Sequence, residues 1–287
     1  MCFERKNMTL QSGLSVCVFL ACFGSCLSDS VVGQDQPGSS AKTEQTKEES
    51  KEQETRKLIA KLGPEASDAF SSGKYKEALA KAKQICDLKP DVVAYQFFRG
   101  NVGFAAGDMS QSIAAFDHVI RLDKSSEPQL WQRGLSLYYA KRFADGVKQF
   151  ETHQTVNSQD VENAVWHLLC AARVSDVEKA RKKLIPITGD TRVPMSQVYE
   201  MFAGRMKPEA VLNAANATSE RVPKDGTNHR LQKYYAHLYI GLYHEMLKKP
   251  VAAKSSLEQA AKINPLAKDN FMGNVAKVHL QLLAAPK

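Results

Sequence analysis

The side chains that could do chemistry are scattered along this chain of 287 residues rather than grouped. His237 and His244 lie seven residues apart on one predicted helix, without the four-residue spacing or the glutamate that an HExxH zinc helix needs. Ser112 and Ser136 stand in the middle of predicted helices, not on the glycine-flanked turn that exposes a nucleophilic serine. The sequence therefore predicts no catalytic residue, no metal ligand and no cofactor, which indicates a protein that is not an enzyme.

A second set of side chains could bind through charge, because the chain carries a net charge of +8. A basic patch is predicted from Arg173, Lys179, Arg181, Lys182 and Lys183. Such a run is typical of a solvated helix face, and the alternative is a patch for acidic proteins, anionic glycans or membrane headgroups. Nucleic acid is not an expected partner, since no base-stacking module accompanies the charge and the chain begins with a predicted export signal.

The elements that must position these side chains follow a period of 34 residues. Gly100 and Gly134 are 34 residues apart, and so are Gly73 and Gly107. Coincident series at one period predict an array of helix pairs. The first two glycines are expected to let the second helix of a pair approach the first closely. The other two are expected in the turn between the helices, where a positive φ favours glycine.

This spacing resembles the tetratricopeptide repeat (TPR). Residues 130–139, followed by Phe143, Gly146 and Phe150, carry bulky, small and aromatic side chains where that repeat has them. The resemblance implies an all-α fold, a right-handed superhelical solenoid of about six helix-turn-helix pairs closed by a capping helix at the C-terminus. The expected units are 59–92, 93–126, 127–160, 161–194, an irregular 195–228 and 234–267, with the cap at 268–287.

A narrower resemblance is carried by residues 202–210 and 234–243, together with the export signal and the polar segment after it. In this order the features are similar to those of the NlpI-type TPR lipoproteins of bacterial envelopes. That resemblance implies a non-enzymatic adaptor in the periplasm, often a homodimer, which docks a processing protease and cell-wall hydrolases. Because TPR scaffolds serve many functions, the motif itself does not name the partner.

In repeats of this type the first helices line the concave surface. The resemblance therefore implies a mostly apolar and aromatic groove suited to an extended or helical polypeptide. Its expected lining is Phe97, Asn101, Phe104, Trp131, Leu135, Tyr138, Val165 and Leu169. The alternative is that some of them, Trp131 above all, belong to the core between repeats. Two functions stay open: an exported scaffold that binds a protein or peptide in this groove, and a self-associating structural protein of the cell envelope.

The first 33 residues have the features of an export signal. Arg5 and Lys6 give a charged start, and residues 14–27 form an apolar run too short to span a bilayer, which needs about 20 residues. Cleavage after Gly33 and acylation of Cys26, as in a lipoprotein, are both open, with an uncleaved anchor as a third alternative. The chain is expected in the periplasm or cell envelope, and at the membrane only if it is lipid-anchored.

Residues 34–57 contain scarcely an apolar side chain, so they are predicted to form a disordered polar linker. The remaining residues, 58–287, are expected to form one continuous repeat domain. Within it, Cys86 and Cys170 fall on predicted helices that are separated by several others. Packed helices lie about 8 to 10 Å apart, so these cysteines are predicted to be free buried thiols rather than a disulfide.

Overall fold

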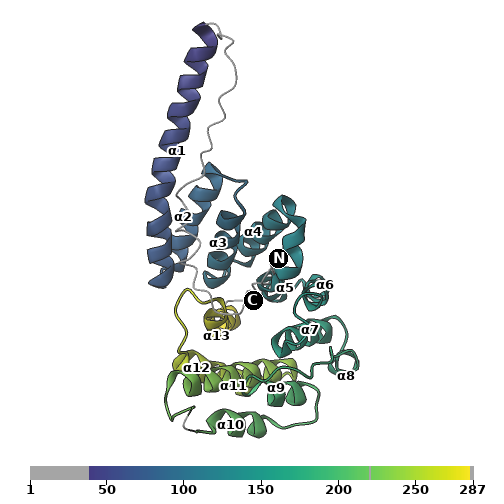
Figure 1. Ribbon diagram of the computed structural model, residues 1–287. Coiled ribbons are helices and arrows are strands. Elements are labelled where there is room, and N and C mark those ends of the chain that lie inside the picture. The colour runs from purple at the N-terminus through teal and green to yellow at the C-terminus, as the bar shows by residue number, and fades with distance from the viewer. Residues whose placement is uncertain (1–38, 220, 285–287) are drawn as a thin grey trace, which may run out of the picture.

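The computed structural model describes residues 39–219 and 221–284, and this part of the chain consists of helices joined by loops, without a strand (Figure 1). The expected all-α class is therefore confirmed for these residues. The helices are α1 (Ser39–Ser71), α2 (Tyr75–Leu88), α3 (Val93–Ala105), α4 (Met109–Leu122), η2 (Lys124–Gln129), α5 (Trp131–Tyr139), α6 (Phe143–Gln154), α7 (Val161–Val174), α8 (Val177–Arg181), α9 (Met195–Phe202), α10 (Pro208–Asn216), α11 (Thr227–Met246), α12 (Pro250–Ile263) and α13 (Phe271–Ala284).

Successive helices pack against each other in pairs, and glycine makes the closest approach within them. A Cβ added to Gly134 of α5 would lie only 2.5 Å from Cζ of Phe150 on α6. At Gly100 of α3 the corresponding distance, to the ring of Phe116 on α4, is 2.6 Å. The aromatic ring of each second helix thus fills the space that a side chain on the first would need. The predicted close approach at Gly100 and Gly134 is confirmed.

The turn between paired helices also recurs. Gly73 and Gly107 both have φ of +78°, as predicted for a turn position that favours glycine. One period further on, Lys141 adopts the same left-handed region with φ of 60°. The turn at Lys141 therefore has the same backbone conformation, although the sequence has no glycine at that position.

Helix α1 corrects the prediction of a disordered linker. Residues 39–57 are helical and continuous with the rest of α1, which extends beyond the other helices (Figure 1). Glutamate, lysine and glutamine favour a helix even where no apolar face is available. Glu52 also pairs with Arg56 one turn later, at 3.1 Å, and with Lys89 just beyond α2, at 2.6 Å. The predicted export signal, Cys26 and the first residues of the expected linker lie outside the described residues.

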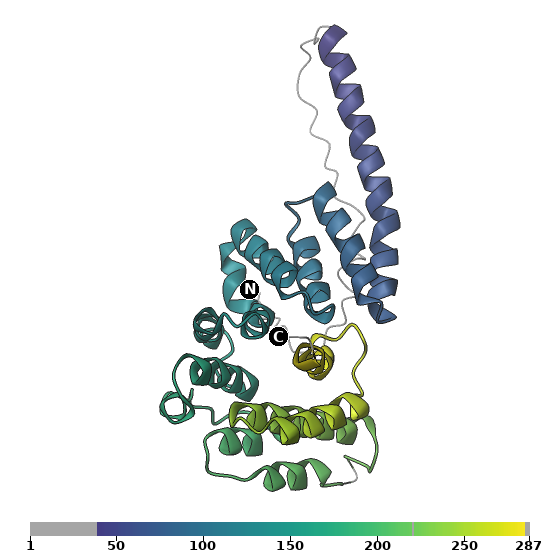
Figure 2. The ribbon, with the colours of Figure 1, turned by 180° about the vertical axis from the view of Figure 1, so that it is seen from behind.

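The helix pairs follow an arc, and α13 lies on its inner side in views from opposite directions (Figures 1 and 2). Helix α13 packs both on α12, its neighbour in sequence, and on α3, near the other end of the arc. A helix that only covers the last pair was expected, so this position is a correction. The largest hydrophobic cluster takes buried residues from both helices of the pairs between α3 and α12 and from α13, so one continuous core joins this part of the arc.

Candidate functional site

The structure places the eight expected groove residues on α3, α5 and α7 as predicted, but they do not line an open groove. Phe97 and Trp131 are half-buried, and the other six are buried. The buried residues are Asn101, Phe104, Leu135, Tyr138, Val165 and Leu169. The expectation of an open aromatic groove is therefore wrong in this structure. Phe271 of α13 packs on Phe104 and Trp131, and Tyr138 is hydrogen-bonded to Glu245 of α11.

Phe271, the first residue of α13, makes the central contact. Its ring stacks on Phe104 of α3 with centroids 4.1 Å apart, and it meets Trp131 of α5 edge-on at 5.2 Å. On the next turns of α13, His279 packs edge-on against Tyr139 at 5.6 Å. We call Phe104, Trp131 and Tyr139 the aromatic face. Every member of the aromatic face contacts a side chain of α13.

A partly buried polar network centred on Glu245 of α11 lies beside the aromatic face. Tyr138 donates a hydrogen bond of 2.8 Å to the Glu245 carboxylate, and Arg173 of α7 forms an ion pair with it. Nε2 of His279 lies 3.8 Å from the same carboxylate, and its Nδ1 lies 3.2 Å from the Tyr139 hydroxyl. Burial lowers the pKa of His279, which favours the neutral imidazole. Four helices thus meet at one carboxylate.

The rim of the α13 contact is polar and charged. The Tyr75 hydroxyl donates to the Lys268 carbonyl at 3.0 Å, and the Ser71 hydroxyl lies 3.1 Å from the Asp269 carboxylate. The ammonium group of Lys277 stands 4.6 Å from the centroid of the Tyr75 ring, a cation–π geometry. The turn between α1 and α2 therefore holds the segment before α13 as well as α13 itself.

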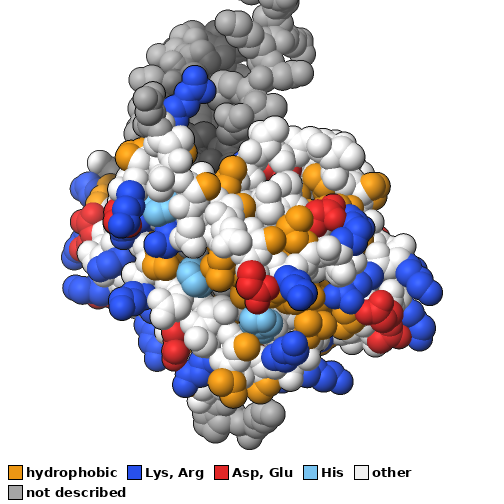
Figure 3. Space-filling model, turned by 90° about the horizontal axis from the view of Figure 1, so that it is seen from below, with side chains coloured by type: hydrophobic (Ala, Val, Ile, Leu, Met, Phe, Trp, Pro, Cys, Tyr) orange, Lys and Arg blue, Asp and Glu red, His pale blue; other side chains and the backbone are white. Residues whose placement is uncertain are grey.

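The predicted basic patch is largely neutralised by neighbouring acids. Arg173 belongs to α7 and pairs with Glu245, whereas the other members lie on α8 or just beyond it. Lys179 pairs with Asp176 at 3.1 Å, and Arg181 pairs with Glu178 at 2.7 Å, which leaves Lys182 and Lys183 exposed. On the face seen from below, lysines and arginines are likewise interspersed with acids and apolar side chains (Figure 3). This arrangement is that of a solvated helix face.

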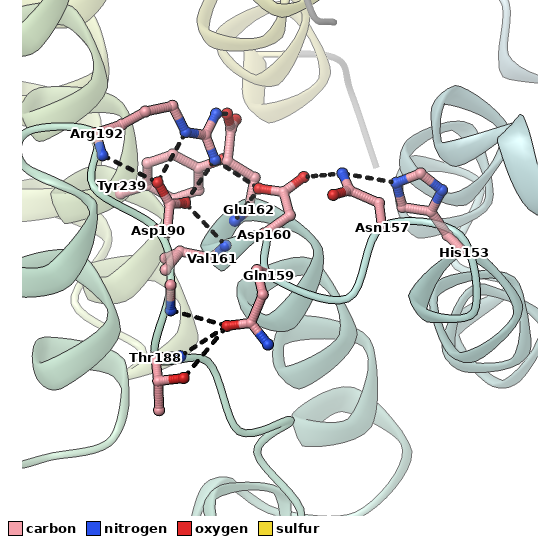
Figure 4. Close-up of polar contacts among 11 residues, drawn as sticks. His153, Asn157, Gln159, Asp160, Val161, Glu162, Thr188, Asp190, Arg192 and Tyr239 are labelled. Atoms are coloured by element: carbon pink, nitrogen blue, oxygen red, sulfur yellow. Dashed lines mark hydrogen bonds and ion pairs between the residues drawn. The ribbon is translucent and has the colours of Figure 1, made fainter. Parts of the chain in front are cut away.

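A second polar cluster, which sequence reasoning did not identify, is centred on Arg192 (Figure 4). Its guanidinium lies 2.6 Å from Asp160, 2.7 Å from Glu162 and 2.6 Å from Asp190. Tyr239 of α11 donates a hydrogen bond of 2.6 Å to Glu162. The Arg192 cluster ties the loop after α8 to the start of α7 and to α11. Nothing in the spacing of these residues in the sequence predicts the long-range pairs.

The pKa values of two acids in the Arg192 cluster are shifted in opposite directions. Burial raises the pKa of Glu162 to about 7, although Arg192 acts in the opposite direction. Burial would also raise the pKa of Asp190, but hydrogen bonds from Arg192 and the Val161 amide lower it below its ordinary value. The three acids hold Arg192 between α7 and the loop after α8. The net charge of the cluster changes when Glu162 gains or loses a proton.

The remaining expectations concern metal, thiol and membrane chemistry. Within residues 39–219 and 221–284, no three His, Cys, Asp or Glu side chains are placed to hold a metal ion. Cys86 and Cys170 are both free and buried, as predicted. No helix in this part of the chain is long and apolar enough to cross a membrane.

Comparison with known proteins gives no assignment, since no protein-family model and no curated protein matches the chain.

Proposed function

We propose that this chain is a non-enzymatic, exported scaffold of TPR-type helix pairs, wound as a right-handed superhelix, that binds helical protein partners at its aromatic face. The resemblance to NlpI-type lipoproteins extends the proposal to an adaptor of the periplasm or cell envelope that recruits a protease or cell-wall hydrolase. In this proposal the chain brings proteins together and converts no substrate.

One observation carries the proposal: the aromatic face already holds a helix, α13. Phe104 and Trp131 both contact the single ring of Phe271, so the face accepts an aromatic anchor from an amphipathic helix. Aromatic anchors of this kind are typical of hot spots where a helix binds in a groove. The 34-residue period and the glycine contacts at Gly100 and Gly134 support the repeat type.

The proposal is tested by capture from an envelope extract of the source organism. The chain from Gln34 onward is immobilised, retained proteins are identified by mass spectrometry, and their size with the bait is measured. Trp131→Ala is compared with Val251→Ala, because Trp131 contacts Phe271 whereas Val251 on α12 is 84 % exposed. We expect Trp131→Ala to weaken binding of the partner by about 2 kcal/mol without loss of helicity.

A protease or cell-wall enzyme that is retained at fixed stoichiometry by the Val251→Ala chain, but lost by the Trp131→Ala chain, would support the adaptor. Retention that is equal for the two variants would place binding away from the aromatic face. Recovery of the chain alone as a stable oligomer would favour the self-associating envelope protein instead.

A further inference from the structure

Helix α13 has the properties of a bound ligand as much as those of a core helix. Its first turn is closed by its own residues, since the Asn270 side chain accepts a hydrogen bond of 2.9 Å from the Gly273 amide. The buried amide of Asn274 donates to the carbonyls of Lys268 and Asn270, both at 2.8 Å. These bonds belong to residues 268–274 and do not depend on the aromatic face. They would persist if α13 moved off the face, whereas the bonds from Tyr234 to the Met272 carbonyl and from Asn264 to the Gly273 carbonyl hold α13 to α11 and to the end of α12.

The contact between α13 and the rest of the chain combines an apolar centre with a polar rim. Phe271 supplies the anchor, and Val275 and Val278 lie fully buried in the same hydrophobic cluster. Lys277, which is exposed, lies at the rim over Tyr75. Phe271, Val275 and Val278 stand at i, i+4 and i+7, the spacing at which a helix presents apolar anchors to a groove. The middle of α13 is also buried on its other sides, where it packs on α12. Cys86 and Cys170 are free and lie on other helices, so neither holds α13 covalently.

We infer that α13 blocks the partner site in cis, and that the partner is an amphipathic helix which competes with it. The inference rests on the proposed function. The competing helix carries an aromatic residue at the place of Phe271, aliphatic residues four and seven positions later, and a basic residue six positions later, at the place of Lys277. The chain exchanges its own helix for the partner's, and the face stays covered in both states.

Competition has a quantitative consequence. A helix tethered by the short segment 264–270 competes at an effective concentration on the order of mM. A free helix of equal intrinsic affinity therefore binds the intact chain poorly. Weakening the docking of α13 must increase the affinity for a helix supplied in trans, whereas damage to the face itself would decrease it.

The test uses the full chain and a fluorescent peptide of residues 265–284, with binding measured by anisotropy. The chain variants are Phe271→Ala, which removes the anchor, and Lys277→Glu, which removes the cation over Tyr75 without touching the core. Val251→Ala is the matched control, since it shortens an apolar side chain that is 84 % exposed. A second peptide carries the Phe271→Ala change and tests whether the anchor itself is recognised.

We expect the Phe271→Ala chain to bind the native peptide at least about tenfold more tightly than the wild-type and Val251→Ala chains do. Lys277→Glu is expected to give a smaller gain, about threefold, and it tests the inference even if Phe271→Ala does not fold. The peptide with Phe271→Ala should bind all chains weakly. Equal affinity of folded wild-type and variant chains for the native peptide, or equal affinity for the two peptides, would overturn the inference.

The peptide experiment and the capture experiment can fail independently of each other. Binding of the peptide in trans establishes the exchange of α13 whether or not an envelope extract yields a partner. Capture of a partner that depends on Trp131, together with failure of the peptide to bind the variant chains, would keep the scaffold but refute competition by α13.

Discussion

Phe271 of α13 stacks on Phe104 of α3, with ring centroids 4.1 Å apart and ring planes 23° from parallel. Through this contact the last helix joins the second helix pair, and residues far apart in sequence share one core. The contact explains why the expected groove is closed, and it leads to a direct prediction of stability.

Replacing Phe271 with alanine should lower the free energy of unfolding by about 2 kcal/mol, less than for a fully buried phenylalanine because the side chain is half-buried. Urea denaturation followed by circular dichroism measures this loss. Val251→Ala should stay within about 0.5 kcal/mol of the wild type. A Phe271→Ala chain as stable as that control would show that the stacking does not contribute to the fold.

Gly134→Ala should destabilise the chain by about 1 to 3 kcal/mol, since the new Cβ would lie 2.5 Å from the buried Phe150 ring and would force α5 and α6 apart. Gly189→Ala is the control. There the new Cβ would lie 3.1 Å from the exposed Gln159 side chain rather than against a buried ring. Thermal unfolding of both variants compares the two positions, and equal shifts would mean that the pair α5 and α6 tolerates a wider separation.

Arg192→Met should cost about 1 to 2 kcal/mol, because it leaves the more buried Asp160, Glu162 and Asp190 without their shared cation, although the arginine itself is 42 % exposed. Arg205→Met removes a comparable arginine that pairs with Glu200 at the surface. That change should cost less than about 1 kcal/mol. The measurement is urea denaturation at pH 7, and similar losses for the two variants would contradict the role of the Arg192 cluster in holding the loop after α8 to α7.

Glu162→Gln should alter how stability depends on pH. The pKa of Glu162 is raised to about 7 from an ordinary 4.5, so the folded chain holds a proton there that the unfolded chain has released. The stability contributed by Glu162 is therefore fully present below pH 4.5 and is lost as the pH rises through 7. Glutamine carries no charge at any pH and keeps an oxygen that can accept the Tyr239 hydrogen bond.

Relative to the wild type, the Glu162→Gln chain should gain up to about 3 kcal/mol between pH 5 and pH 8. Free energies of unfolding at four pH values across that range give the trend. Glu200→Gln, at the surface, should show no comparable gain. If the free energies of unfolding of the Glu162→Gln chain and the wild type differed by the same amount at every pH, Glu162 would be ionised throughout that range.

The helix pairs could be predicted from sequence because their determinants are local and repeated. Gly134 and Phe150 belong to one pair, so their spacing alone encodes the contact. Lys141 shows the limit of this reasoning: it adopts the turn conformation of Gly107 but cannot be recognised as a turn residue by its type. The length of α1 was not predicted for another reason. A segment with few apolar residues cannot pack into a core, but it can still form a helix.

The candidate site was harder to predict because it depends on contacts between distant segments. Trp131 and Tyr138 are predicted as inner-side residues, but nothing in their spacing reveals that Phe271 packs on Trp131 or that Glu245 accepts a hydrogen bond from Tyr138. The Arg192 cluster likewise joins residues from α7, a loop and α11. Periodicity describes neighbours in sequence, whereas these contacts join segments that lie far apart in the sequence.

The position of α13 also determines the order in which the molecule is completed. Ribosomes produce the chain from its N-terminus, so Phe104, Trp131 and Tyr139 are made before the helix that covers them. They remain uncovered until α13 has been synthesised. A chain that is cut short before Phe271 would present its apolar interior to its surroundings, and quality-control proteases that act on exposed hydrophobic surface would distinguish it from the finished protein.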